Sequence, residues 1–498
     1  MSKLNKDILF LIFEELQDDS KSLFSCLMIN KLWCETVVPI LWKNPWRYNI
    51  NYNNKSYLFN IIEFYLSNDT KEYLIKERIR LPLITSKSPP FFDYLSFCRS
   101  ININILNTII SIESLLDYDK FLLQQEFYGL FMKKLPELKF LDMRSIKHQI
   151  FYFPEAKIRL ESLCELKCDT SIDSSYFYGL ARICQRIQRL IIINVEPKTN
   201  RGITKLIEVQ KNLKYFEWID DFNEDYFTED PYREIFLELE KKADVLKHLE
   251  LLFIYLDGFD FYSTSLKKLL PKLHKLKTLI TNEFSYNNGN LSERLIYNDL
   301  QVLNIGFISI HEASIIIGNS GGRLKEVSLK PCEFLKYEGN FSDNSLIFIR
   351  KIYENCPLIE YLSLTFYSSK DHFNELENLL KICQNLKSLL LITSNIFIRE
   401  TKEKNLENGE NLLKILIKSA TINLRELRFF NDIKFSLKAL EEFLEKWRGR
   451  PAITILTSDF TYESEDYRIL INNYKNYGVI KVFRRESTMN VEDMNFKI

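Results

Sequence analysis

The chain has 498 residues, its 67 Lys and Arg are balanced by 67 Asp and Glu, and 46% of its residues are hydrophobic. A net charge of zero excludes the general positive field that attracts a protein to nucleic acid or to an anionic membrane. The hydrophobic content excludes a disordered chain, and the length suits either about three domains or one long repetitive unit.

The longest apolar run near the N-terminus, Ile8 to Phe13, ends at Glu14 and is too short to cross a membrane. It also lacks the cleavage site of a signal peptide, so we expect a soluble protein. The nine cysteines are spread along the chain without a C-x-x-C pair, which favours reduced thiols over disulfides or a zinc site. We therefore expect a cytoplasmic or nuclear protein, or both, with no metal and no cofactor.

The first 46 residues carry the periodicity of three short helices. Residues 4–16 place five apolar residues on one helical face, with Asn5 as the expected N-cap. Ser20 or Ser22 is expected to cap a second helix, and a third helix is expected to end at Pro39. Three of the five tryptophans follow within residues 33–46. These apolar residues form either a private core against the rest of the chain or a docking face for helices of another protein.

This segment, Leu4 to Trp46, resembles an F-box, the module that attaches substrate receptors to the small Skp adaptor of cullin-RING ubiquitin ligases. The match runs through the opening leucine, the apolar residues of the first helix, Ser22-Leu23, Ile29 to Trp33, and Leu41-Trp42. Asn5 stands where the family usually has a proline, which leaves the entry to the first helix less rigid. The resemblance implies that the adaptor is bound by Leu4, Ile8, Leu9, Ile12, Phe13, Leu16, Leu23, Leu27, Ile29, Trp33, Leu41 and Trp42.

Eleven copies of an L-x-x-L-x-L unit follow between Leu138 and Phe429. Their fourth positions fall at residues 141, 166, 190, 216, 249, 276, 303, 327, 362, 389 and 427. The sixth copy has a second possible register three residues later, at Leu276-Lys277-Thr278-Leu279. A repeat of this length predicts a short strand followed by a helix, stacked so that each unit buries its leucines against the next.

The predicted fold class is therefore α/β: a three-helix F-box, a helical connector, and a leucine-rich-repeat horseshoe with parallel strands on its concave face and helices outside. The expected boundaries are residues 1–46, 47–134 for the connector and solenoid cap, 135–460 for the repeats, and 461–498 for a C-terminal cap and tail. Cys184, Cys356 and Cys383 occupy one equivalent repeat position, where we expect buried thiols. Cysteine-bearing repeats of this length resemble those of fungal-type F-box leucine-rich-repeat receptors.

Side chains on either side of the second leucine of each unit point away from the leucine core. They mix aromatic residues with both charge signs, which suits recognition of a protein segment, although a merely solvated sheet would look the same. An acidic run from Asp220 to Glu234 leaves the same two alternatives open. The candidate substrate-binding residues are Tyr215, Glu217, His248, Glu250, Lys275, Lys277, Asn304, Tyr361 and Arg428.

Enzyme signatures are missing from the sequence, which has no H-E-x-x-H and no G-x-S-x-G motif. The glycine-rich stretch 318–322 lacks the lysine of a phosphate-binding loop. We therefore expect a non-catalytic protein. The resemblance implies the substrate-recognition subunit of an SCF-type ubiquitin ligase, whose partners are the Skp-type adaptor, through it a cullin, and an unknown protein target marked for proteasomal degradation. The alternative is a leucine-rich-repeat interaction scaffold unrelated to ubiquitination.

Overall fold

The computed structural model describes the chain except for residues 1–4, 49–55, 80, 82–89, 114–115, 197, 223–231, 254–260, 283–294, 307, 331–339, 394–400, 431–432 and 487–498. The chain divides into two compact units, Met1–Lys242 and Ala243–Ile498. Leu4, one of the predicted adaptor-binding residues, lies outside the described residues.

The first unit begins with helices and continues as strand-helix repeats. Its strands are β1 (Ser100–Asn102), β2 (Phe140–Asp142), β3 (Glu165–Asp169), β4 (Arg189–Asn194) and β5 (Tyr215–Asp220). Its α-helices are α1 (Lys6–Glu15), α2 (Ser20–Leu27), α3 (Lys31–Lys43), α4 (Ser56–Phe64), α5 (Asn68–Lys76), α6 (Tyr94–Phe97), α7 (Ile103–Glu113), α8 (Asp117–Lys134), α9 (Ala156–Leu160), α10 (Ser174–Ile183), α11 (Arg201–Val209) and α12 (Arg233–Glu240).

The second unit alternates strands and helices to its end. Its strands are β6 (His248–Leu252), β7 (Thr278–Thr281), β8 (Val302–Gly306), β9 (Glu326–Lys330), β10 (Tyr361–Phe366), β11 (Ser388–Thr393), β12 (Glu426–Phe430), β13 (Ile453–Thr457) and β14 (Ile480–Arg485). Its α-helices are α13 (Phe261–Leu269), α14 (Ile310–Gly318), α15 (Phe341–Asn355), α16 (Lys370–Ile382), α17 (Lys402–Ser419), α18 (Leu437–Trp447) and α19 (Glu465–Asn476).

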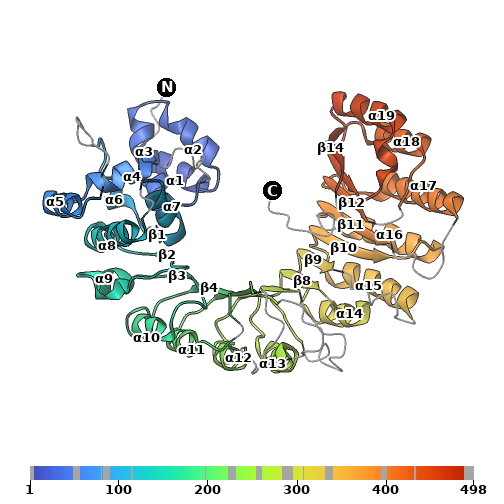
Figure 1. Ribbon diagram of the computed structural model, residues 1–498. Helices are drawn as coiled ribbons and strands as arrows, with labels where there is room; N and C mark the ends of the chain where they lie inside the picture. The colour runs from blue at the N-terminus through green and yellow to red at the C-terminus, as the bar shows by residue number, and fades with distance from the viewer. Residues whose placement is uncertain are drawn as a thin grey trace. The chain divides into compact units, whose positions relative to one another are not determined.

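Within each unit the strands follow one another in chain order and pair in parallel, which confirms the α/β class. The second leucines of successive repeats are register partners, as in Leu141 with Leu166 and Leu362 with Leu389. Figure 1 shows α10 to α12 on one side of β3 to β5, and α14 to α17 on one side of β8 to β11. The leucines face these helices and are fully buried, so the repeated hydrophobic position holds strand to helix.

The predicted buried cysteines are confirmed. Cys184, Cys356 and Cys383 follow α10, α15 and α16 directly and are 0% exposed. Each one fills the space where a helix turns back toward the next strand, and burial raises the pKa of each thiol to about 12. They are core side chains.

Three local predictions need correction, whereas the N-cap position predicted for Asn5 is confirmed. Helix α3 runs through Pro39 instead of ending there, because the next two residues, Ile40 and Leu41, are buried and keep the last turn packed. Asp19, not a serine, caps α2 by accepting the backbone N–H of Ser22 at 3.1 Å. Asn5 occupies the N-cap of α1 without a side-chain hydrogen bond. Strand β1, paired with β2, lies in the segment expected to be entirely helical.

Candidate functional site

The apolar residues of α1 do not share one environment. Leu9 and Phe13 are each 1% exposed, whereas Ile8 and Ile12 are 48% and 44% exposed. Residues four apart lie on the same helical face, so the helix presents one buried pair and one exposed pair. The private core is thus formed by the buried pair, while the exposed pair is left accessible to solvent.

The private core is shared by all three helices. Phe13 packs edge-to-face on Trp33 at 5.1 Å between ring centroids, and Leu23 of α2 and Leu41 of α3 complete the buried cluster. Leu16, Leu27, Trp33 and Trp42 are partly buried against it. Of the predicted adaptor-binding set, Leu9, Phe13, Leu23 and Leu41 therefore shape the unit from inside and are not accessible to a partner.

Besides Phe10, six apolar side chains on α1, on α2 and on the two residues after α2 are exposed, and we refer to these six as the α1–α2 apolar surface. Its members are Ile8, Leu11, Ile12, Phe24, Met28 and Ile29, which are between 41% and 88% exposed. Leu11, Phe24 and Met28 were not among the predicted adaptor-binding residues, and Leu11 and Met28 lie off the helical stripe that leads to the core. Their positions off that stripe were the signal for exposure.

The end of α3 is fixed to the edge of the sheet. The backbone N–H of Arg99 donates to the carbonyl of Lys43 at 3.0 Å, and the indole N–H of Trp46 donates to the carbonyl of Ser100 at 2.9 Å. The three-helix segment therefore pairs one backbone group of β1, the Ser100 carbonyl. These two hydrogen bonds join the end of α3 to the start of the sheet.

On the face of β3 to β5 that is free of helices, the helix-free face, four side chains form one cluster. The Arg189 guanidinium lies 3.7 Å from the ring centroid of Tyr215 and pairs with Glu165 at 3.2 Å and Glu217 at 3.9 Å. The Tyr215 hydroxyl donates to Glu217 at 2.8 Å. Burial raises the pKa of Glu165. Two predicted residues, Tyr215 and Glu217, are thus brought together, and the other two members were not selected from sequence.

In the second unit the predicted residues behave differently from strand to strand. His248 and Glu250 neighbour each other on β6, with Nε2 and Oε2 separated by 3.4 Å. Asn304 on β8 and Tyr361 on β10 are half-buried on strands of the same sheet. These four positions are confirmed as outward-facing strand residues.

Arg428 does not offer a free side chain, contrary to the prediction. It is 4% exposed, and its Nε donates to Glu426 at 2.6 Å. The leucine-rich pattern could not indicate this, because burial depends on neighbouring strands, and an apolar cluster lies beside Arg428 on the same face of β11 and β12. That cluster consists of Leu390, Ile392 and Phe430.

The prediction for Lys275 and Lys277 is also wrong, because the sixth repeat adopts its second register. Strand β7 begins at Thr278, and Leu279 is the register partner of Leu249 and of Leu303. Lys275 lies in the preceding turn, and Lys277 precedes the strand. The positions flanking the strand leucine are those of Thr278 and Ile280.

Neither metal-binding nor membrane-spanning features appear in the part of the chain that the structure describes. Among those residues, no group of three or more His, Cys, Asp or Glu side chains could hold a metal ion. No described helix is both long and apolar enough to cross a bilayer.

No protein-family model and no curated protein sequence matches the chain. Solved structures do match it, including these two. One is a chain of the Rad7 and Elc1 complex in yeast, with a TM-score of 0.30, 14% identity, and coverage of 78% of this chain and 92% of that one. The other is a Bacteroides fragilis protein, with a TM-score of 0.28 and 12% identity over 53% of this chain. The match spans 64% of the Bacteroides chain, less than two thirds of its length.

Proposed function

We propose that the chain is the substrate-recognition subunit of an SCF-type E3 ubiquitin ligase. In this proposal the N-terminal helices are an F-box that binds a Skp-type adaptor and, through it, a cullin. The helix-free face of the repeats binds a protein target for ubiquitination and proteasomal degradation. The observation that carries the proposal is the α1–α2 apolar surface, which lies on the segment with the F-box residue pattern and is followed by strand-helix repeats.

The exposed side chains of that surface give the docking step its driving force. Burial of apolar area contributes about 25 cal/mol per Å², so six large side chains covered by partner helices would supply several kcal/mol. The buried residues of the same helices hold the surface in shape, since Leu9 and Phe13 fix α1 against α3. A small helical unit that exposes this much apolar area fits a partner-binding role.

The proposal gives the chain no catalytic residue. It would act by holding a target near a ubiquitin-charged enzyme, which raises the local concentration of the reacting groups. The Arg189 cluster on β3 to β5 would contribute to target recognition, because its aromatic ring and mixed charges suit a polar protein segment. The cytoplasm or the nucleus, or both, would be the site of action.

The adaptor step is tested by calorimetric titration of the purified chain with a Skp-type adaptor. Ile8→Glu and Ile12→Glu place a charge on the exposed surface and leave the core intact. We expect each to weaken binding about tenfold or more, because an unpaired carboxylate would be buried in the complex. Ile469→Glu on α19 is the matched control, since Ile469 is 53% exposed on another helix. Unchanged affinity in both α1 variants would contradict the adaptor assignment.

The target step is tested by proximity labelling in cells with and without proteasome inhibition. Targets should accumulate near the wild-type chain under inhibition, and Ile12→Glu should bind them without promoting their loss. If every labelled protein were degraded at the same rate with the wild type and with the variant, the proposed role in degradation would be contradicted.

A leucine-rich-repeat scaffold is the second candidate. It is favoured by the contact between Trp42 and Tyr94, whose ring centroids lie 4.4 Å apart. This contact packs α3 on α6, as expected if the N-terminal helices serve only as a cap on the repeats. A monodisperse chain that shows no affinity for the adaptor would favour the scaffold.

A further inference from the structure

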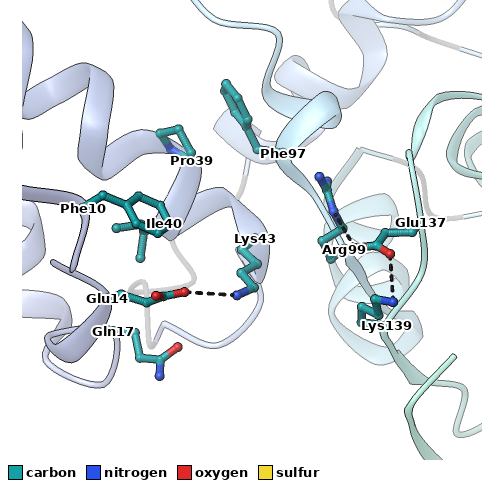
Figure 2. Close-up of a pocket in the computed structure, with 10 residues that line it drawn as sticks. All are labelled: Phe10, Glu14, Gln17, Pro39, Ile40, Lys43, Phe97, Arg99, Glu137 and Lys139. Carbon is teal, nitrogen blue, oxygen red and sulfur yellow. Dashed lines mark ion pairs between the residues drawn. The ribbon is translucent and has the colours of Figure 1, made fainter. Parts of the chain in front are cut away.

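A pocket of about 450 Å³ lies between the N-terminal helices and the start of the sheet. Its volume falls within the range of roughly 300–1,000 Å³ that is typical of ligand pockets. One wall comes from α1 and α3, and the opposite wall comes from the residues that lead into β1 and β2. Figure 2 shows Glu14 and Lys43 facing Arg99, Glu137 and Lys139 across the pocket.

Three cations and two carboxylates line this pocket. Glu137 is shared by Lys139 at 2.8 Å and Arg99 at 3.3 Å, and these cations lower the pKa of its carboxyl group. Glu14 is paired only loosely with Lys43, at 3.7 Å. The lining charges therefore leave one net positive charge, and the side chain of Lys43 is 58% exposed. A carboxylate would restore the balance.

The pocket also has an apolar part. Phe10 of α1 is 40% exposed, and Phe97 and Pro39 are partly buried around the same space. Figure 2 shows Phe10 and Pro39 on the helix wall, with Phe97 across from them. A bulky apolar group can therefore pack beside Phe10 and Phe97 while a carboxylate next to it reaches the cations.

We propose that this pocket binds a segment of a partner protein in which a large apolar side chain is flanked by Asp or Glu. The charge complementarity points to an acidic segment, and the apolar wall points to an aromatic or leucine-like anchor. None of the pocket-lining residues belongs to the α1–α2 apolar surface. Phe10 lies two residues from both Ile8 and Ile12, about 200° around the helix, so it faces away from these two residues, whereas Leu11 lies about 100° away at the border of the surface. The inference therefore stands apart from the proposed adaptor docking.

The test uses the full chain and three labelled peptides, Gly-Asp-Phe-Asp-Gly, Gly-Asn-Phe-Asn-Gly and Gly-Lys-Phe-Lys-Gly, with fluorescence anisotropy as the readout. The acidic peptide should bind with a dissociation constant below about 1 mM and most tightly of the three. Its affinity should fall as salt is added, because salt screens the exposed cations. Absence of acidic-peptide binding at that concentration, or equal binding of all three peptides, would overturn the proposal.

Variants assign the binding to the pocket. Lys43→Glu and Lys139→Glu should each weaken the acidic peptide about tenfold, whereas Lys211→Glu, an exposed lysine outside the pocket, should change nothing. Phe10→Ala should weaken all three peptides about fivefold without altering the salt dependence. Its control is Phe460→Ala, since Phe460 is 69% exposed elsewhere. Equal effects of pocket and control variants would overturn the assignment.

A competition experiment separates this site from adaptor docking. Excess Skp-type adaptor should leave the acidic peptide bound, because Phe10 and Glu14 of the pocket face away from Ile8 and Ile12 on α1. Displacement of the peptide by the adaptor would overturn the proposal of a separate partner. Failure of the adaptor to bind, with the peptide still bound, would count against the ubiquitin-ligase assignment alone.

Discussion

His372 and Ser345 link two neighbouring helices of the second unit: the imidazole Nε2 lies 2.6 Å from the Ser345 hydroxyl oxygen. The other ring nitrogen lies 2.8 Å from the hydroxyl of Ser369. Because the Ser345 hydroxyl donates to the carbonyl of Ser342 at 2.9 Å, its oxygen accepts from Nε2–H. This assigns the neutral tautomer. His372 is fully buried, and desolvation lowers its pKa to about 4.

This pKa predicts a loss of stability in mild acid. An imidazole whose pKa is lower in the folded state than in the unfolded state stabilises the fold only while it is neutral. The contribution is therefore complete above the unfolded pKa of 6.5 and declines as the pH falls toward 4. Between about pH 7 and about pH 5, His372 should lower the free energy of unfolding by roughly 2 kcal/mol.

The contribution of His372 is measured by denaturant unfolding of wild type and His372→Gln at several pH values. The variant cannot be protonated, so its pH dependence should be shallower by that amount. His274→Gln serves as the control, because the His274 side chain is 50% exposed. Parallel pH curves for wild type and His372→Gln would contradict the assigned role.

The two faces of α1 predict opposite stability effects. Leu9→Ala and Phe13→Ala should each cost about 2–5 kcal/mol, because both remove a fully enclosed side chain. Ile8→Ala and Ile12→Ala should stay within about 0.5 kcal/mol, since their side chains already contact water. Trp33, Trp42 and Trp46 lie in this segment, so tryptophan fluorescence during urea unfolding reports on it. Comparable losses from both pairs would show that α1 is buried on both sides.

The buried leucines of the strands could be predicted from sequence because one residue type recurs at one strand position. The pattern alone did not fix the register of the sixth repeat, since Leu276 and Leu279 both fit it. Pairing of Leu279 with Leu249 and Leu303 decided between them. Strand β1 had no such signal, because its three residues are defined by pairing with β2 and by the end of α3.

The contacts of individual side chains could be predicted from the sequence even less well. Arg428 occupies an outward strand position, and only the three-dimensional neighbourhood buries it beside Glu426. The apolar stripe of α1 spanned more of the helix than α3 can cover, so Ile8 and Ile12 stayed exposed. Helical periodicity identifies an amphipathic helix, but the packing partner sets the width of the buried face.

Replacement of Asp220, at the end of β5, should lower the stability of the protein substantially. Its carboxylate is 8% exposed and accepts hydrogen bonds from Asn194 at 2.8 Å, Trp218 at 2.8 Å and Tyr232 at 2.7 Å. Asp220→Ala leaves these buried donors without their acceptor and should cost about 3 kcal/mol or more. Asp220→Asn keeps one acceptor oxygen and should cost less.

The measurement is the free energy of unfolding of each Asp220 variant, beside Asp244→Ala. The Asp244 side chain is 91% exposed, so its removal should change stability by no more than about 0.5 kcal/mol. An Asp220→Ala loss as small as that of the control would mean that water replaces the carboxylate.

The cysteines provide a final test of how the repeats are packed. Cys184, Cys356 and Cys383 are completely buried, and burial raises the pKa of their thiols to about 12. Since the thiolate is the reactive form, these three should resist iodoacetamide in the native protein. Cys34 and Cys164 are partly exposed and should be alkylated first.

Peptide mass spectrometry of the native chain, with a guanidinium-denatured sample as the reference, measures the alkylation at each site. Cys356 and Cys383 should be labelled only when the second unit unfolds globally. Cys184 should be labelled only when the first unit unfolds globally. Denaturant should therefore bring Cys356 and Cys383 into reaction together. Native-state labelling of Cys356 as fast as that of Cys34 would show that the α15 turn opens locally, independently of the leucine core.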